Sequence, residues 1–196
     1  AEKTARSTGL HDSEGYAMNI ECPDEELLAL VVRHQGHFRL ESGHHGRVWL
    51  DLDTLFLRPS RLRRFAAAIA LRLSGLTIEA VCGPLVGGAF LAQAVASELD
   101  VDFYYTERVA TSREGGPDSV TYQLPEVIRD RAGGKRVAVV DDAINAGSAV
   151  RATCLDLRAV RARPVALAAL LILGIPDAEL AAAWDVPLVG LVHMPN

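Results

Sequence analysis

The sequence predicts an α/β fold in which a mostly parallel sheet is covered by helices on both faces. Its apolar segments are nearly continuous, as in VAVV (137–140) and PVALAALLIL (164–173), and do not alternate with polar residues. Such segments are typical of strands buried on both faces of a sheet. They alternate along the chain with segments of helical periodicity, which is the order that produces parallel βαβ units. Ligands of such sheets bind at the carboxyl ends of the strands.

Length and composition limit the classes of protein to consider. A chain of 196 residues with 49% hydrophobic and 23% charged residues is typical of a globular protein with one sizeable core. We expect a flexible arm over residues 1–20 and a single domain over residues 21–196. The formal net charge of −5 gives no general attraction to nucleic acid or to an anionic membrane. A phosphate ligand would therefore be bound locally, by backbone amides and a few arginines.

The cysteines and the longest apolar segment predict a cytoplasmic protein. Cys22, Cys82 and Cys154 are widely separated and fit neither a metal-binding pair nor an even set of disulfides. The apolar segment VALAALLILGI (165–175) is too short to span a bilayer and is interpreted as a buried strand. The sequence thus predicts neither a membrane nor a nucleic acid as a partner.

The first part of the chain predicts a helix, a hairpin and a second helix. PDEELLALVVRHQG (23–36) has a proline at its start, helical spacing of apolar residues and a closing glycine, and predicts a helix of about three turns. HFRLESGHHGRVWLDLDTLF (37–56) alternates apolar and polar residues around a Gly/His turn, as a hairpin does. SRLRRFAAAIALRLSG (60–75) returns to helical periodicity between Ser60 as N-cap and Gly75.

The second part of the chain predicts the repeating strands and helices of the sheet. The strand TIEAVCGP (77–84) leads through a glycine loop into the helix GGAFLAQAVASELD (87–100). The strand VDFYY (101–105) precedes a long polar section, residues 106–123, for which no regular structure is predicted. The remaining predicted elements are the strand RVAVV (136–140), a helix from Ser148, and the strands PVALAALLIL (164–173) and PLVGLV (187–192).

The segment VAVVDDAINAGSAV (137–150) is the strongest functional signal. Asp141 and Asp142 repel each other at the end of a buried strand, so a cation, a set of hydroxyl donors or a nearby arginine must compensate them. Ala143 to Ser148 are small apart from Ile144 and lead directly into a helix, whose N-terminus and loop amides form a phosphate cradle. A sugar phosphate would satisfy both parts. A solvated loop with a helix cap is the alternative interpretation.

This segment resembles the signature of the type I phosphoribosyltransferases, which bind 5-phosphoribosyl 1-diphosphate (PRPP). The resemblance implies their fold: a central, mostly parallel sheet flanked by helices, with a small N-terminal hood of a helix and a hairpin. It implies that Asp141 and Asp142 are catalytic and hold the ribose 2′ and 3′ hydroxyls. It also implies that the 5′-phosphate is bound by Ala143, Ile144, Asn145, Ala146, Gly147 and Ser148. Asn145 replaces the family's usual threonine.

Two further segments resemble the orotate enzymes of this family. GHFRLESGHHGRVWLDLD is similar to their N-terminal hairpin, which implies a base-binding role for Phe38, Glu41, Ser42 and Gly43. CGPLVGGAFLA is similar to their pyrophosphate-binding loop, which implies that role for Leu85, Val86, Gly87 and Gly88. Without the resemblance, this second segment is a strand-to-helix turn with glycines for tight packing.

The resemblance implies a Mg²⁺-dependent homodimer that converts orotate and PRPP to orotidine 5′-monophosphate and pyrophosphate, with the metal held mainly by PRPP. Two departures keep other functions open. Glu41 stands where these enzymes usually carry a lysine, and the segment TERVATSREGG offers only Arg108 and Arg113 as catalytic cations for the leaving pyrophosphate. The alternatives are a phosphoribosyltransferase for a different base and a non-catalytic sensor of PRPP or nucleotides.

Overall fold

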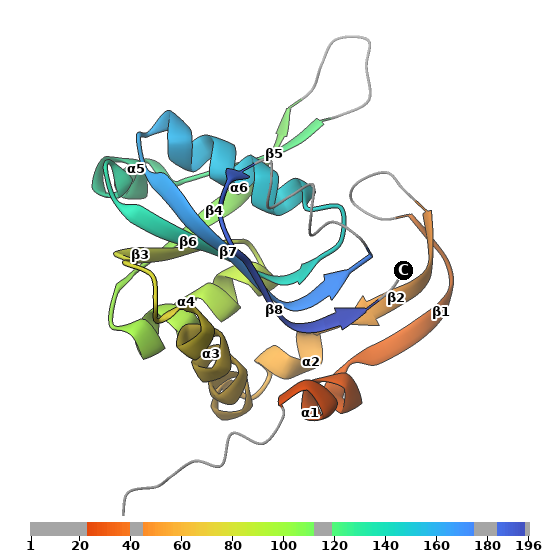
Figure 1. Cartoon of the computed structure of the whole chain (residues 1–196). Helices are drawn as coiled ribbons and strands as arrows, with labels where there is room; N and C mark the ends of the chain where they lie inside the picture. The colour runs from red at the N-terminus through yellow and green to blue at the C-terminus, as the bar shows by residue number, and fades with distance from the viewer. Residues whose placement is uncertain (1–22, 40–44, 112–118, 175–183, 195–196) are drawn as a thin grey trace, which may run out of the picture.

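The predicted mostly parallel sheet is confirmed in the computed structural model, which describes residues 23–39, 45–111, 119–174 and 184–194 (Figure 1). A six-stranded sheet has the strand order β5-β4-β3-β6-β7-β8. Neighbouring strands are parallel except for β5, which is antiparallel to β4. The strands are β3 (Ala80–Pro84), β4 (Asp102–Thr111), β5 (Ser119–Gln123), β6 (Arg136–Ile144), β7 (Arg163–Leu173) and β8 (Leu188–Met194).

The strand order reverses between β3 and β6. From β3 the chain passes through a helix to β4 on one side, whereas from β6 it passes through a helix to β7 on the other side. The segments that leave the carboxyl ends of β3 and β6 therefore lie at the position in an open α/β sheet where ligands generally bind. These are the two glycine loops that the sequence analysis singled out.

Helices cover both faces of the sheet. One core contains α3 (Pro59–Leu73) and α4 (Gly87–Leu99), and the other contains α6 (Ser148–Ala159). Alternate residues of β6 serve the two cores: Ala138 and Val140 contribute to the first, Val137 and Val139 to the second. This alternation explains why strand β6 is apolar without interruption. Among the described helices, none is long and apolar enough to cross a membrane.

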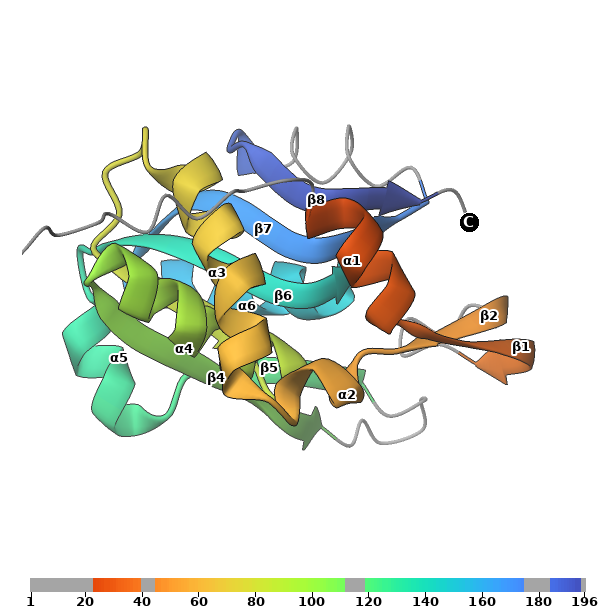
Figure 2. The ribbon, with the colours of Figure 1, turned by 90° about the horizontal axis from the view of Figure 1, so that it is seen from below.

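A helix and a hairpin precede the sheet, as the predicted hood requires. Helix α1 (Pro23–Leu30) is followed by β1 (Val32–Arg39) and β2 (His45–Asp51), which pair antiparallel in a separate two-stranded sheet. The short helix α2 (Asp53–Phe56) then connects β2 to α3. Figure 2 shows the hairpin projecting on the side to which the carboxyl ends of β6 and β8 point.

The predicted helix over residues 23–36 is wrong in its second half. The helix ends at Leu30, and Val32 to Gln35 pair with residues 48–51 of β2. The adjacent β-branched residues Val31 and Val32 favour a strand over a helix, and the partner that stabilises this strand lies elsewhere in the sequence. Residues 40–44 of the predicted hairpin turn lie outside the described residues.

Residues 106–111 and 119–123, for which no regular structure was predicted, form strands, and residues 112–118 lie outside the described residues. Strand β4 continues to Thr111 and changes partner along its length: residues 102–106 pair with β3, and residues 107–111 pair with β5. Valines and threonines make up much of this hairpin, and both residue types favour strands. Helix α5 (Glu126–Ala132) follows β5 and was not predicted. The hairpin extends the sheet beyond the carboxyl end of β3.

Candidate functional site

The loop after β3 lies against the acidic pair at the end of β6. A Cβ atom at Gly87 would overlap Oδ2 of Asp142 and lie 2.7 Å from its Cγ. A Cβ atom at Gly88 would lie 2.5 Å from Oδ1 of Asp141 and 2.8 Å from Cδ of Pro84. These separations are too short for any side chain larger than glycine's hydrogen. The two segments singled out in the sequence therefore meet at one place, the reversal of strand order.

The acidic pair is held by backbone amides of its own strand. The N–H of Asp142 donates to Oδ1 of Asp141 at 3.0 Å, and the N–H of Ala143 donates to Oδ1 of Asp142 at 2.8 Å. Only 8% of Asp141 is exposed. Burial raises the pKa of Asp142, and the nearby Asp53 raises it further, while hydrogen bonding with Asp141 and hydrogen bonds from backbone amides lower it. A ligand that donates hydrogen bonds or brings a cation would relieve this charge.

The N-terminus of α4 is a compensating group that the sequence analysis did not consider. The helix begins at Gly87, so its first two residues are the glycines that approach the carboxylates. The positive end of a helix dipole stabilises nearby negative charge. The sequence signal was the Gly-Gly pair at the start of a helix, because glycine there lets the backbone approach another group closely.

The turn after the acidic pair is shorter than predicted. Ala143 and Ile144 still belong to β6 and pair with Leu171 and Ile172 of β7, and the Ile144 side chain is buried in the core beneath α6. The turn proper consists of residues 145–147. Gly147 adopts a φ of +69°, which favours glycine.

Helix α6 begins directly after this turn. Its first residue is Ser148, and the N–H of Arg151 donates to the carbonyl of Gly147 at 2.8 Å. Ala146 and Ser148 are exposed and Asn145 is half-buried. A helix N-terminus that follows a partly exposed turn suits an anion, because its free N–H groups can face a phosphate.

The loop between β3 and α4 begins with two exposed apolar residues. Leu85 is 37% exposed and Val86 64% exposed, and the peptide bond between them is cis. The N–H of Leu85 donates to the carbonyl of Thr106 on β4 at 2.9 Å, which anchors the start of the loop. A Cβ atom at Gly83 would collide with the backbone of Gly88, so this turn is packed backbone against backbone.

The structure places some of the remaining predicted residues and leaves others open. Phe38 lies in β1 opposite Gly46 and is half-buried. Arg108 is exposed on the part of β4 that pairs with β5, opposite Tyr122. Glu41, Ser42, Gly43 and Arg113 lie outside the described residues. The site thus brings together the acidic pair and both glycine loops, with the hood and the β4–β5 hairpin at the same end of the sheet (Figure 2).

Comparison with known families gives the same assignment. Residues 58–186 match the family model of the phosphoribosyl transferase domain, which spans α3 through the strands and loops of the site. The chain belongs to the phosphoribosyltransferase family. The family prediction from the acidic segment is therefore confirmed.

Relatives within the family carry the name orotate phosphoribosyltransferase. The protein of this name from Wolinella succinogenes is 31% identical over 158 residues, which cover 78% of this chain and 69% of that one. The one from Caldanaerobacter subterraneus subsp. tengcongensis is 31% identical over 125 residues, covering 62% of this chain and 59% of that one. The chain thus matches roughly three fifths to two thirds of the length of these two relatives.

Solved structures show the same fold. Adenine phosphoribosyltransferase from Trypanosoma brucei superposes with a TM-score of 0.69 at 19% identity, covering 86% of this chain and 78% of that one. Orotate phosphoribosyltransferase from Aeropyrum pernix superposes with a TM-score of 0.60 at 25% identity, covering 85% of this chain and 88% of that one. The predicted type I phosphoribosyltransferase fold is confirmed.

Proposed function

We propose that the protein is an orotate phosphoribosyltransferase, which converts orotate and PRPP to orotidine 5′-monophosphate and pyrophosphate. The observation that carries the proposal is the meeting of two glycine loops and an acidic pair where the strand order reverses. The sequence likeness to proteins named orotate phosphoribosyltransferase supports the choice of acceptor base.

The geometry suits a ligand with phosphate groups at both ends of a pentose. Asp141 and Asp142 would accept hydrogen bonds from the ribose hydroxyls. These bonds would offset the free-energy cost of burying the charge of Asp142. The turn over residues 145–147 and the start of α6 would bind the 5′-phosphate. The loop of Leu85 to Gly88, in which Leu85 and Val86 are exposed, would bind the diphosphate through its backbone amides.

The roles of Ala143 and Ile144 are narrower than the family resemblance implies. The Ala143 amide already donates to Asp142, and the Ile144 side chain is buried. We therefore propose that these two residues position the acidic pair and the turn, and that the direct 5′-phosphate contacts come from Asn145, Ala146, Gly147 and Ser148.

Displacement of pyrophosphate develops positive charge on the ribose ring and negative charge on the leaving group. Cations and amides placed at the departing oxygens stabilise that charge, and exclusion of water strengthens their effect. Arg108 is placed on a hairpin at this end of the sheet, and an arginine fork suits phosphate oxygens. We propose Arg108 and Arg113 for this role, and Phe38, Glu41, Ser42 and Gly43 for contacts with the base.

The acidic pair also fits a Mg²⁺ ion that is shared with the substrate. Mg²⁺ prefers oxygen ligands and commonly binds one or two carboxylates together with substrate phosphates. Within the described residues, no group of three or more His, Cys, Asp or Glu side chains converges on a metal site of its own. We therefore propose that PRPP oxygens supply most of the ligands. When bound, the ion would neutralise charge on the diphosphate as it leaves.

Two further assignments remain part of the proposal. We propose a homodimer, because the resemblance to orotate enzymes implies that cations of one subunit reach the site of its partner. We also propose a cytoplasmic location. Cys82 and Cys154 are free and buried, as thiols in a reducing compartment are.

The acceptor base is tested by measuring pyrophosphate release from PRPP and Mg²⁺ with each base added separately. The bases are orotate, uracil, adenine, guanine, hypoxanthine and xanthine. Release that depends on orotate supports the proposal. Release with another base would overturn the choice of base and point to Glu41 as the determinant, which replacing it with lysine would check. Binding of PRPP without release for any base would favour the sensor.

A further inference from the structure

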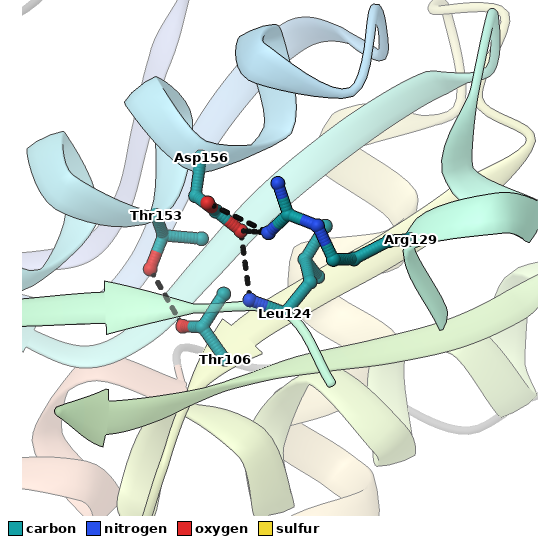
Figure 3. A network of polar contacts seen from close by, with 5 residues as sticks. All are labelled: Thr106, Leu124, Arg129, Thr153 and Asp156. Carbon is teal, nitrogen blue, oxygen red and sulfur yellow. Dashed lines mark hydrogen bonds and ion pairs between the residues drawn. The ribbon is translucent and has the colours of Figure 1, made fainter. Parts of the chain in front are cut away.

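Helix α6 contacts the neighbouring elements through buried and half-buried polar groups (Figure 3). Thr153 and Asp156 are three residues apart and so lie on the same face of the helix. Oδ2 of Asp156 accepts a hydrogen bond from the N–H of Leu124 at 2.7 Å and pairs with Nη1 of Arg129 at 2.7 Å. The hydroxyls of Thr153 and Thr106 lie 2.8 Å apart. These contacts join α6 to β4, to the end of β5 and to α5.

Thr106 is also the anchor of the diphosphate loop. It is the last residue of β4 that pairs with β3, where it lies opposite Pro84. Its carbonyl oxygen accepts the hydrogen bond from Leu85, the first residue after β3. The main chain of Thr106 therefore fixes where the loop of Leu85 to Gly88 begins.

Thr153 belongs to the helix that begins at the end of the 5′-phosphate turn, residues 145–147. It lies five residues after Ser148, at which α6 and the 5′-phosphate turn join. Both hydroxyls are completely buried, and each is a hydrogen-bond partner of the other. A buried hydroxyl without a partner is unfavourable, so the contact keeps α6 at a fixed position along β4. Thr106 thus contacts both the loop of Leu85 to Gly88, through its carbonyl, and the helix that follows the 5′-phosphate turn, through its hydroxyl.

We propose that the Thr106–Thr153 hydroxyl pair is a positioning device that sets the spacing between the two phosphate-binding loops. The proposal rests on the proposed function. A pentose with phosphate groups at both ends binds both loops at once, and the second contact strengthens binding only if the spacing fits the ligand. A ligand that occupies a single loop does not depend on that spacing. The pair therefore selects ligands by their length and acts without touching them.

The test compares one ligand that spans both loops with two that occupy one loop each. PRPP is the spanning ligand, and ribose 5-phosphate and pyrophosphate are the single-loop ligands, each measured by calorimetry with Mg²⁺ present. The variants are Thr106→Val, Thr153→Val and the double variant. Valine matches the shape of threonine, so each single change leaves one buried hydroxyl unpaired, whereas the double change removes both hydroxyls.

We expect the single variants to lose stability and the double variant to recover a melting temperature close to that of the wild type. In the double variant, the affinity for PRPP should fall about fivefold, which corresponds to the loss of one hydrogen bond's constraint. The affinities for ribose 5-phosphate and pyrophosphate should not change. A merely structural role would predict that PRPP affinity recovers together with stability.

Unchanged PRPP affinity in the double variant would overturn the inference, and so would an equal loss for all three ligands. The variants Thr106→Ser and Thr153→Ser keep the hydroxyls and should keep the affinity for PRPP. A loss in these serine variants as large as in the valine variants would assign the effect to packing and also overturn the inference. A wild-type protein that binds no PRPP would overturn the proposed function itself, a result that the variants are not needed to detect.

Discussion

The two ends of the central sheet differ in how their carboxylates are paired. At the amino end, Asp102 is paired through one oxygen: Lys135 Nζ lies 2.6 Å from its Oδ2, and the hydroxyl of Tyr104 donates to the same oxygen at 3.0 Å. At the carboxyl end, two carboxylates adjoin each other beneath a helix N-terminus. Among the residues that the structure describes, no lysine or arginine forms an ion pair with Asp142. The carboxylate at the amino end is paired within the fold, and we propose that the carboxylates at the carboxyl end receive a ligand.

The pKa shifts at the two ends have opposite signs. The hydrogen bond from Lys135 lowers the pKa of Asp102 below its usual 3.8. Its contribution to stability is therefore present above pH 3.8 and is lost as the pH falls through the lowered pKa. Burial raises the pKa of Asp142, so its ionisation destabilises the fold as the pH rises from 3.8 through the raised value. An acid that destabilises its own fold when ionised is a mark of a functional site.

Replacement of Asp142 by asparagine should give the largest effect and sharpen this contrast. The change removes the buried charge and keeps an oxygen for the Ala143 amide, so the free energy of unfolding at pH 7 should rise. The loss of two hydrogen bonds to a charged group should lower kcat/KM about 100-fold. Denaturant unfolding curves at pH 7 measure the free energy of unfolding, and initial rates measure kcat/KM. The matched control is Asp130→Asn on the surface of α5. A lower free energy of unfolding for the Asp142 variant would contradict the contrast between the two ends of the sheet.

Replacement of Gly87 by alanine tests whether the approach of α4 to the acidic pair matters. The added Cβ would overlap the Asp142 carboxylate, which should lower the free energy of unfolding by about 2 kcal/mol and kcat/KM roughly 30-fold. Gly75→Ala is the control, because a Cβ atom there meets no atom within 4 Å. If Gly87→Ala and Gly75→Ala have the same free energy of unfolding and the same kcat/KM, the close approach of α4 to the acidic pair is not required for stability or activity.

Replacement of Arg108 by alanine tests the proposed cation of the leaving group. Removal of one charge-assisted hydrogen bond to pyrophosphate should lower kcat about tenfold. Stability should change little, because the side chain is exposed. The control is Arg63→Ala, which removes an exposed arginine paired with Glu98, a residue near the end of α4 remote from the site. An unchanged kcat in the Arg108 variant would transfer the role to Arg113 or to backbone amides.

The parallel core of the fold and the acidic pair were predictable from the sequence, because local patterns determine them. Continuous apolar runs mark strands buried on both faces, and the string from Val137 to Ser148 contains a strand, two carboxylates, a small turn and a helix start in sequence. The structure differs only in how far β6 extends. Ala143 and Ile144 remain in the strand because β7 offers them partners, and a partner strand cannot be read from the local sequence.

Most of the errors and omissions involve contacts with residues outside the local segment. Residues 32–36 of β1 were predicted as helix, and no regular structure was predicted for β5, because each strand is stabilised by a neighbouring strand. The buried pair of Thr106 and Thr153 joins residues 47 positions apart and leaves no pattern in either segment. The close approach of Gly87 to Asp142 likewise depends on the order of strands in the sheet. The loops are therefore evident in the sequence, whereas the contacts that hold them together are evident only in the structure.

The smallest effect is expected at the amino end, for the replacement of Lys135 by methionine. Lys135 and Asp102 are about one third and one half exposed, so solvent screens their attraction, and the free energy of unfolding at pH 7 should fall by only about 0.5 kcal/mol. Because the hydrogen bond to Asp102 raises the pKa of Lys135, the wild type should keep this contribution at pH 9 and lose it only above pH 10.5. In 1 M salt the difference between variant and wild type should disappear, whereas kcat/KM should match the wild type at every salt concentration. An effect on turnover would mean that the two ends of the sheet are coupled, and the division of stability and function between them would then be wrong.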